Sequence, residues 1–468
     1  MTRHALALAA LFTLTACPQP GPSDGGTGGG GATGGGGATG GGGATGGGGA
    51  TGGGGATGGG GATGGGGATG GGSPGPFDAG HLNCTFEPAF ELGPSVDAPS
   101  SITVAVAMTE SGEAIYAWVD PRGVAYRVQS PSGALGPEQL DADAGTVPFL
   151  TVMARGGRAL LAYSQSSTTG SETRARRYAT TSGWATQELV DPAPMALGGM
   201  RVELEADGSA TLWRQDMYAM APLDEFTSVG TAPFGPPRTL ANAAFVYSAT
   251  RSNGTTMSVL LQDFSSTPEL LFTTAGADSR TVMTNATPTG SDYFHSALAD
   301  DGTAVTAGVF TLNTVQGLSA IVRTGGALSP AERVSEFGAG GLPYFRSMGV
   351  LAGPGGRATV IWWDSGRVLV SRRSAGAWST PTVIATTDLV VPRYTRINDA
   401  RGLVHYSNGG AYFIEVGADG YVGPETASTE FFGATYGTEF AAGGSNAAAI
   451  KTETAADGGV LVKAAQCR

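Results

Sequence analysis

Four aspartates recur at the ends of short apolar segments of the sequence, three of them close to a tryptophan. Carboxylates that surround one face of a protein could hold a cation or accept hydrogen bonds from sugar hydroxyls. The candidate ligand-binding residues are Asp120, Asp216, Asp263, Trp363 and Asp364. The alternative is that aspartate begins a turn at a repeated position, because its side chain can bond its own backbone two residues further on.

Other side chains that commonly perform chemistry are few. After the leader the histidines are His81, His295 and His405, and the last two lie in different repeat units with no cysteine nearby, so no zinc site is expected. The segment from Asp141 to Gly145 resembles half of a calcium-binding loop but lacks the later bidentate carboxylate, so we expect a solvated turn. No pair of carboxylates departs from the repeat. We predict no catalytic residue, no metal and no cofactor.

The charge of the chain excludes one class of partner. The sequence has 26 basic and 38 acidic residues, and without Arg3 and Asp24, which precede the globular part, 25 and 37 remain, so the net charge stays at −12. Nucleic-acid binding depends on a basic surface that releases counterions from the phosphates. We therefore expect no nucleic-acid partner.

A glycine-containing turn between two short strands recurs along the chain, and it predicts the elements that carry these residues. The glycines of these turns are Gly112, Gly157, Gly208, Gly254, Gly302, Gly356, Gly402 and Gly444. From Gly112 to Gly444 seven intervals span 332 residues, a mean of about 47, which is the length of a four-stranded propeller blade. We predict an all-β fold, a β-propeller of eight four-stranded blades. Seven blades, or two β-sandwich domains, are the alternatives.

The last repeat unit lacks its outer strand, and a matching segment lies at the other end of the domain. Outer strands of the other units follow a turn glycine and often a proline, which an edge strand tolerates. The last unit ends at residues 460–463, whereas residues 86–92 have the proline and aliphatic spacing of an outer strand. This arrangement resembles the ring closure of β-propellers, in which strands from both chain ends share one blade.

The first residues have the pattern of an export signal with a lipid-attachment site. Arg3 is followed by an apolar segment, residues 5–13, that is too short to span a bilayer. Leu14-Thr15-Ala16-Cys17 then resembles the lipobox of bacterial lipoproteins. The resemblance implies a signal peptide over residues 1–16 and acylation of Cys17. The alternative is an ordinary secretory signal followed by a spare cysteine.

Residues 17–80 join the lipid site to the globular domain, residues 81–468. Gly-Gly-Gly-Gly-Ala-Thr recurs there with a period of six, and such a tract behaves as a flexible coil. Its root-mean-square reach is roughly 40 Å. Pro18 stands where an aspartate would imply retention in the inner membrane, so the lipoprotein resemblance implies the outer membrane or the cell surface.

Two cysteines flank the junction of the chain ends. Once Cys17 is lipidated only Cys84 and Cys467 remain, and an exported compartment permits their oxidation. We expect them to form a disulfide that replaces the peptide connection between the third and fourth strands of other blades. Two buried free thiols, or one intermolecular bridge, are the alternatives.

Taken together, these features resemble a bacterial lipoprotein with a degenerate propeller repeat. We therefore expect a monomer, anchored in a lipid bilayer through Cys17, whose propeller binds an unidentified protein, peptide or glycan without catalysis. The loops of the face opposite the tether are the expected binding surface. An extracellular polysaccharide hydrolase or lyase is the alternative, and it would need two convergent carboxylates.

Overall fold

Short alternating segments between glycine turns form strands along the whole described part of the chain. The computed structural model describes residues 81–94, 102–142, 146–167, 170–191, 198–216, 222–241, 245–261, 267–274, 277–286, 294–336, 348–387, 392–398, 400–408, 410–427, 438–456 and 459–468. These residues belong to the larger of the two units of the chain, Gly70–Arg468, and only this unit is described here. Cys17 and the predicted tether lie outside the described residues.

The strands build eight antiparallel sheets, which we number as blades 1 to 8. Blade 1 contains β2 (Val104–Met108), β3 (Ala114–Asp120), β4 (Gly123–Gln129) and β5 (Gln139–Ala142). Blade 2 contains β6 (Thr146–Arg155), β7 (Arg158–Ser167), β8 (Gly170–Ala179), β9 (Gly183–Trp184) and β10 (Glu188–Asp191). Blade 3 contains β11 (Gly198–Leu204), β12 (Ala210–Asp216), β13 (Leu223–Ser228) and β14 (Arg238–Ala241). Blade 4 contains β15 (Phe245–Ser252), β16 (Thr255–Leu261), β17 (Glu269–Thr274) and β18 (Ala277–Val282).

The second half of the chain repeats the same order. Blade 5 contains β19 (His295–Leu298), β20 (Ala304–Leu312), β21 (Val315–Thr324), β22 (Ala327–Leu328) and β23 (Glu332–Glu336). Blade 6 contains β24 (Met348–Gly353), β25 (Arg357–Asp364), β26 (Arg367–Ser374), β27 (Ala377–Trp378) and β28 (Thr382–Thr386). Blade 7 contains β29 (Arg393–Arg396), β30 (Arg401–Ser407), β31 (Ala411–Gly417) and β32 (Thr426–Ala427). Blade 8 contains β33 (Glu439–Gly443), β34 (Asn446–Thr454), β35 (Val460–Cys467) and β1 (Phe90–Glu91).

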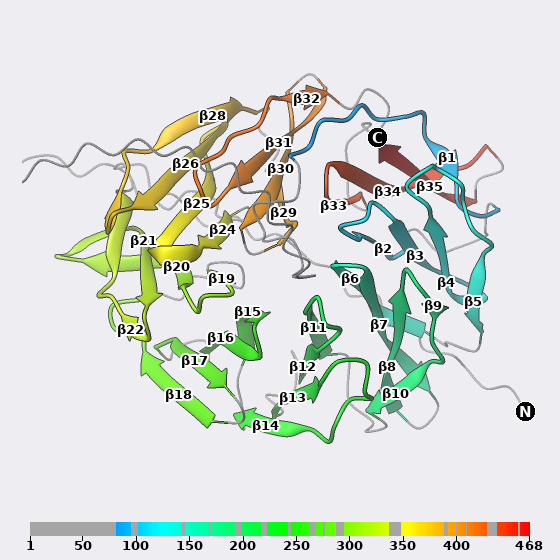
Figure 1. The fold of residues 1–468 in the computed structure, drawn as a ribbon, viewed down its shortest axis with the longest axis horizontal. Helices are drawn as coiled ribbons and strands as arrows, with labels where there is room; N and C mark the ends of the chain where they lie inside the picture. The colour runs from blue at the N-terminus through cyan, green and yellow to red at the C-terminus, as the bar shows by residue number, and fades with distance from the viewer. Residues whose placement is uncertain are drawn as a thin grey trace, which may run out of the picture. The chain divides into compact units, whose positions relative to one another are not determined.

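The eight blades form a closed ring, with the first strand of each blade at the centre and the last at the rim (Figure 1). This confirms the predicted eight-bladed β-propeller, and the alternatives of seven blades and of two β-sandwich domains are wrong. Turns between first and second strands, and between third and fourth strands, share one face of the ring. We call it the turn face, and the face with the other loops the loop face.

Both chain ends contribute to blade 8, as predicted. β1 pairs with β35, and Phe86 forms a bridge with Cys467, so the N-terminal strand is the outer strand of the last blade. Cys84 and Cys467 form a disulfide with their Cα atoms 5.3 Å apart, which confirms the predicted pairing. The covalent link stands where the other blades have a turn between third and fourth strands.

Blade 8 also meets blade 1 at a glycine. A Cβ atom at Gly443 would lie 2.2 Å from the carbonyl oxygen of Thr109, so only glycine allows this approach of the two backbones. In the turn beside it Gly112 has a φ of 87°, a left-handed conformation that glycine adopts without steric cost. The repeated glycines therefore shape the turns and let the blades lie close together.

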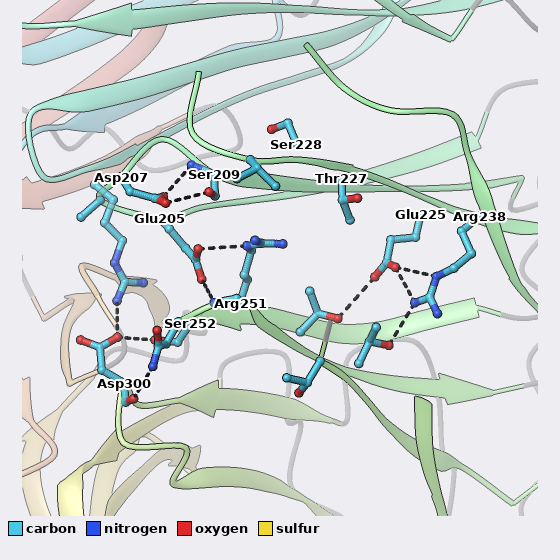
Figure 2. A pocket seen from close by; sticks show the side chains of 18 of the residues that line it. Glu205, Asp207, Ser209, Glu225, Thr227, Ser228, Arg238, Arg251, Ser252 and Asp300 are labelled. Atoms are coloured by element: carbon cyan, nitrogen blue, oxygen red, sulfur yellow. Dashed lines mark hydrogen bonds and ion pairs between the residues drawn. The ribbon is translucent and has the colours of Figure 1, made fainter. Parts of the chain in front are cut away.

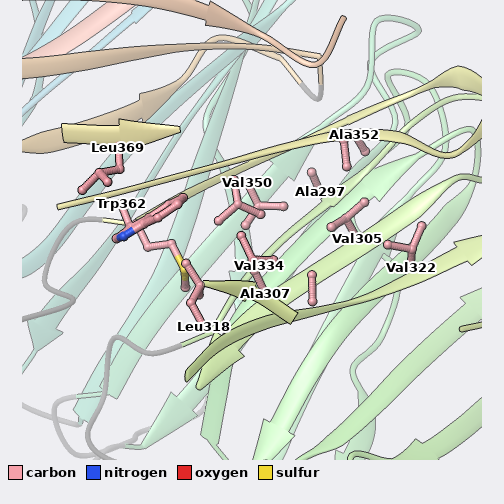
Figure 3. Packing of buried hydrophobic residues seen from close by; sticks show 14 of the residues in the cluster. Ala297, Val305, Ala307, Leu318, Val322, Val334, Val350, Ala352, Trp362 and Leu369 are labelled. Carbon is pink, nitrogen blue, oxygen red and sulfur yellow. The ribbon is translucent and has the colours of Figure 1, made fainter. Parts of the chain in front are cut away.

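Apolar side chains fill the space between neighbouring blades. Between blades 5 and 6, small residues such as Ala307 and Ala352 pack beside Leu318, Val350 and Trp362 (Figure 3). Because blades face each other on both sides, their second strands read as continuous apolar runs rather than alternating ones. The hydrophobic core is therefore divided among the blade interfaces around the ring.

Arginines link the blades at the turn face. Arg177 of blade 2 donates to the carbonyl oxygen of Gly208 and to the hydroxyl of Ser228, both in blade 3, at 2.8 Å each. Arg373 of blade 6 donates to Glu332 of blade 5 at 2.7 Å. Such bonds satisfy turn carbonyls that would otherwise meet only solvent.

The described residues contain one short helix, the 3-10 turn η1 (Pro354–Gly356). Within those residues no helix has the length and apolar character needed to cross a membrane.

Candidate functional site

A cleft of about 960 Å³, with charged and hydroxyl side chains in its walls, lies between blades 3 and 4 and opens at the turn face (Figure 2). The turn after β11 forms one wall and the turn after β15 forms the other, while β13, β14, β16 and β17 supply further lining together with Arg155 of blade 2 and Asp300 of blade 5. The cleft is thus built from segments that the ring brings together rather than from one continuous motif.

An ion pair joins the two walls. Glu205 of blade 3 lies 3.3 Å from Arg251 Nε of blade 4, and its other oxygen accepts the backbone N–H of Gly254 at 2.8 Å. Arg251 in turn donates to the hydroxyl of Thr211 at 2.7 Å. Because the carboxylate holds both the guanidinium and the backbone of the opposite turn, it fixes the width of the cleft at this end.

A second set of ion pairs, centred on Arg238, lies in the part of the cleft formed by β13 and β14. Glu225, whose side chain is 2% exposed, accepts from Arg238 at 2.6 Å, and Arg238 also donates to Asp278 at 2.7 Å. Burial of the Asp278 carboxylate opposes its ionisation, but hydrogen bonds from Arg238 and Thr273 outweigh that effect, so its pKa lies below the ordinary value. The guanidinium is therefore held between two carboxylates, one in each blade.

The rim of the cleft carries an accessible carboxylate, Asp300. Asp300 of blade 5 has a side chain that is 59% exposed, and it accepts a hydrogen bond from Ser252. Arg155 of blade 2 approaches the same carboxylate at 3.9 Å, and the amide of Asn253 lies 3.4 Å from the Asp300 carbonyl oxygen. A ligand at the rim would meet Asp300 before any other charged group named here.

The lining of the cleft is rich in groups that form hydrogen bonds. Each of Glu205, Glu225 and Asp300 faces an arginine, and Asp207 accepts from Ser209 at 2.8 Å. The rest of the described lining is rich in hydroxyl side chains and contains no aromatic ring, histidine or cysteine. Over the described ranges, no group of three or more His, Cys, Asp or Glu side chains has a geometry that could hold a metal ion.

The sequence-predicted candidates that the structure describes lie at strand ends in three different blades. Asp120 ends β3 in blade 1, Asp216 ends β12 in blade 3, and Trp363 and Asp364 end β25 in blade 6. The side chain of Asp216 and the whole of Asp263 lie outside what the structure describes. A common ligand surface at the loop face stays a prediction.

The described candidates form hydrogen bonds with residues of their own blades. Asp120 is buried and accepts from both the backbone N–H and the guanidinium of Arg122, at 2.7 Å and 2.5 Å. Trp363 Nε1 donates to Thr387 at 3.1 Å, and Asp364 accepts from Arg367 at 3.1 Å. These contacts match the alternative that aspartate begins a turn at this position.

One expectation about the calcium-like segment is wrong. Asp141 is buried rather than solvated, because it closes a polar network between blades 1 and 2. It accepts from Arg176 at 2.6 Å, from Gln187 at 3.0 Å and from Tyr163 at 3.2 Å. Burial, and to a lesser extent the charge of Asp141, raises the pKa of the neighbouring Tyr126 to about 12.

One cleft residue, Glu205, follows a charged series in the sequence. Along β11, Arg201 and Glu203 alternate with the apolar Met200, Val202 and Leu204, and Glu205 continues the charged series. The first strand of blade 1, by contrast, reads Val-Ala-Val-Ala-Met. The charged residues of β11 therefore distinguish it from the apolar first strand of blade 1.

The fold places the chain among eight-bladed β-propeller proteins. No family model and no curated protein matches its sequence. Among solved structures, one of two prolyl endopeptidases shares 10% identity with a TM-score of 0.43, over 77% of this chain and 54% of that one, so this chain spans about half its length.

Two further structures are similar over more of their own length. The β-propeller domain of the Trilobed protease from Pyrococcus furiosus shares 9% identity, with a TM-score of 0.42, over 69% of this chain and 94% of that one. An ulvan lyase, described as a new family of polysaccharide lyase, shares 10% identity, with a TM-score of 0.43, over 73% and 96%. No activity is carried over from similarities this distant.

Proposed function

We propose that this protein is a lipid-anchored display protein whose propeller binds an extracytoplasmic protein, peptide or glycan without converting it. The observation that supports binding is the cleft between blades 3 and 4, about 960 Å³ in volume, with rigidly held charged groups and many hydroxyls in its walls. Polar groups fixed by their own partners present a preformed pattern, so a ligand loses little binding energy to their ordering.

The proposed anchor is Cys17, with residues 17–80 as a flexible tether to the outer membrane or cell surface. His81 stacks on Tyr421 in the turn between the third and fourth strands of blade 7, so the described chain begins at the turn face, which also carries the cleft. A flexible coil with a reach of roughly 40 Å leaves either face free to turn outward.

Loss of Cys17 is expected to release the protein from the membrane. In Cys17→Ser the acyl chains have no attachment site, and two or three such chains are what makes anchoring stable. The protein should move from the detergent phase to the aqueous phase in a phase-partition experiment. A variant that stays in the detergent phase would contradict lipidation at this residue.

The cleft carboxylates support binding rather than hydrolysis. A glycosidase needs one carboxylic acid that begins protonated and a second free carboxylate at a defined separation. An arginine partner stabilises the charged form of a carboxyl group and occupies its oxygens. Glu205 and Glu225 have such partners, so these two carboxylates are poor candidates for an acid and base pair.

Two charge reversals can locate the binding surface. The full chain carrying Cys17→Ser is screened on glycan and peptide arrays, and the selected ligand is then titrated against Asp300→Lys and Asp364→Lys. Both side chains are accessible, with exposed fractions of 59% and 35%, so neither change should unfold the domain. We expect Asp300→Lys to weaken binding by about ten-fold or more, since it reverses a charge at the rim, and Asp364→Lys to leave it unchanged.

The opposite pattern would move the binding surface to the loop face, where Asp120, Asp216, Asp263, Trp363 and Asp364 were predicted. Incubation of the same ligand with the protein, followed by mass spectrometry, tests catalysis. Accumulation of a cleaved product would contradict the non-catalytic proposal.

A further inference from the structure

The outer strand of blade 4 differs from those of the other blades. β18 lies at the rim of the ring (Figure 1), and all six of its residues are exposed. Among the outer strands of the described residues, no other is exposed along its whole length. β18 also pairs with β17 at six positions without a bulge. By contrast, β10, β14, β23 and β28 are bulged, β5 has four residues, and β1 and β32 have two each.

A long and regular edge of this kind is open to pairing with another strand. Proteins usually protect their sheet edges with bulges, with proline or with very short strands, and β18 has none of these. Its only charged residues are Asp278 and Arg280, which have opposite signs. They oppose pairing only where like charges would meet, so the order of charges on an incoming strand decides whether it fits.

The hydrogen-bond pattern of blade 4 shows which backbone groups face outward. Just beyond β18 the N–H of Met283 donates to the carbonyl oxygen of Pro268 at 2.8 Å. Hydrogen-bonded pairs recur at every second residue of an antiparallel ladder. Every second residue of β18, beginning with Ala277, therefore bonds β17, whereas the N–H and C=O groups of Asp278 and Arg280 point away from it. Within the described part of the chain these outward groups have no backbone partner.

Both charged side chains of β18 are held on the side of blade 3. Asp278 accepts from Arg238 of blade 3 at 2.7 Å, and Arg280 donates to the carbonyl oxygen of Leu240, also in blade 3, at 2.5 Å. Both side chains nevertheless stay partly exposed. A carboxylate can accept from more than one donor and a guanidinium has five N–H groups, so each can bond a further group at the edge.

The order of charges along β18 is complementary to itself. When two copies pair antiparallel about a twofold axis, outward groups must meet outward groups, so an axis near the middle of the strand passes through Asp278, Ser279 or Arg280. An axis at Asp278 sets two aspartates opposite each other, and an axis at Arg280 sets two arginines opposite each other. Only an axis at Ser279 places Asp278 of each copy opposite Arg280 of the other, which is favourable at both pairs.

We propose that β18 is a docking edge for a second copy of this chain, joined antiparallel with the twofold axis at Ser279, so that blade 4 of one copy continues into blade 4 of the other. The contact involves only a short strand from each copy, far less than a stable interface needs, so the pair is weak and reversible. Such a pair departs from the monomer that the sequence led us to expect. Neither the lipid anchor nor a cleft ligand is needed for it.

A cysteine at the axis tests the proposed register. In this register Ser279 lies opposite its counterpart in a non-hydrogen-bonded pair, with Cβ atoms about 4.5 Å apart, close enough for a disulfide. The full chain carrying Cys17→Ser and Ser279→Cys has this one free thiol, because Cys84 and Cys467 are bonded to each other. Under mild oxidation we expect a covalent dimer to form about ten-fold faster than with Thr382→Cys, at an exposed position of the bulged outer strand β28.

Charge reversals test the pairing in a second way. In the Ser279→Cys chain, Asp278→Arg sets two positive residues opposite each other and Arg280→Asp sets two negative ones, so each variant alone should cross-link about ten-fold more slowly. An equimolar mixture of the two variants restores opposite charges at both pairs and should cross-link at the parent rate. Arg367→Asp, at an accessible arginine of blade 6, is the matched control and should leave the rate unchanged.

Two results would overturn the proposal. One is an equal rate of cross-linking for Ser279→Cys and Thr382→Cys, and the other is a mixture of reversed variants that reacts no faster than either variant alone. If a charge reversal does not fold, sedimentation of the Cys17→Ser protein at rising concentration replaces it. A reversible shift from monomer to dimer that Ser279→Cys traps covalently would support the pairing, whereas a monomer at every concentration with no covalent dimer would contradict it.

Discussion

Replacing Glu415 with alanine is expected to lower the free energy of unfolding by about 3 to 5 kcal/mol, the usual effect of breaking a buried ion pair. Glu415 and Arg401 of blade 7 are both only 2% exposed, with Arg401 Nε 2.5 Å from the carboxylate. The same carboxylate accepts the backbone N–H of Leu82 at 2.7 Å. The variant therefore removes the carboxylate from a buried guanidinium and also releases the N-terminal segment.

An exposed pair supplies the matched control for this prediction. Arg393 and Glu439 are 46% and 49% exposed and lie 3.1 Å apart. Exposed pairs contribute about 0 to 1 kcal/mol, so Glu439→Ala should change stability little. Denaturant unfolding of both variants measures the difference. Equal small changes would show that the buried pair stabilises the fold no more than the exposed one does.

Loss of the Cys84–Cys467 disulfide is the second large effect that we expect. The bond joins residues 383 positions apart, and for loops of this length chain-entropy models give a stabilisation on the order of 5 kcal/mol, with measured values often smaller. Cys84→Ala combined with Cys467→Ala, in the Cys17→Ser background, should unfold at a clearly lower denaturant concentration.

Reductant provides an independent check of the same bond. It should lower the unfolding midpoint of the Cys17→Ser protein and leave that of the cysteine-free variant unchanged. A midpoint that does not respond to reductant, with both thiols open to alkylation after treatment, would show that the disulfide does not stabilise the ring.

The fold could be predicted from the sequence because the features that specify it, the turn glycines and the residues of the outer strands, lie within short segments of the chain. The turn glycines repeat at a nearly constant interval, and Gly112, Gly208 and Gly302 all adopt the positive φ that their turns require. The proline and aliphatic residues of segment 86–92 indicated an outer strand, and the structure places this segment beside β35. The last repeat unit lacks an outer strand and this segment supplies one, so the closure of the ring could be predicted as well.

The candidate site could not be predicted in the same way, because its contacts join different blades. Glu205 and Arg251 lie in blades 3 and 4, and only the geometry of the ring brings them together. The contact of Asp120 is local instead, since its partner Arg122 is two residues away in the same turn. Glu205, by contrast, bonds residues of the next blade, and no local pattern in the sequence indicates that contact.

The closure of blade 8 also determines how the domain bears mechanical load. If the chain is pulled at its N-terminal end, tension passes along residues 81–84 and reaches the disulfide before it reaches β1. β1 pairs with β35 at only two positions, so by itself it would peel away one residue pair at a time. The covalent bond instead transfers the tension to β35, which pairs with β34 along its whole length, from Val460 to Cys467. Under a load applied at its N-terminal end, the propeller therefore resists force through one of its best-paired hairpins.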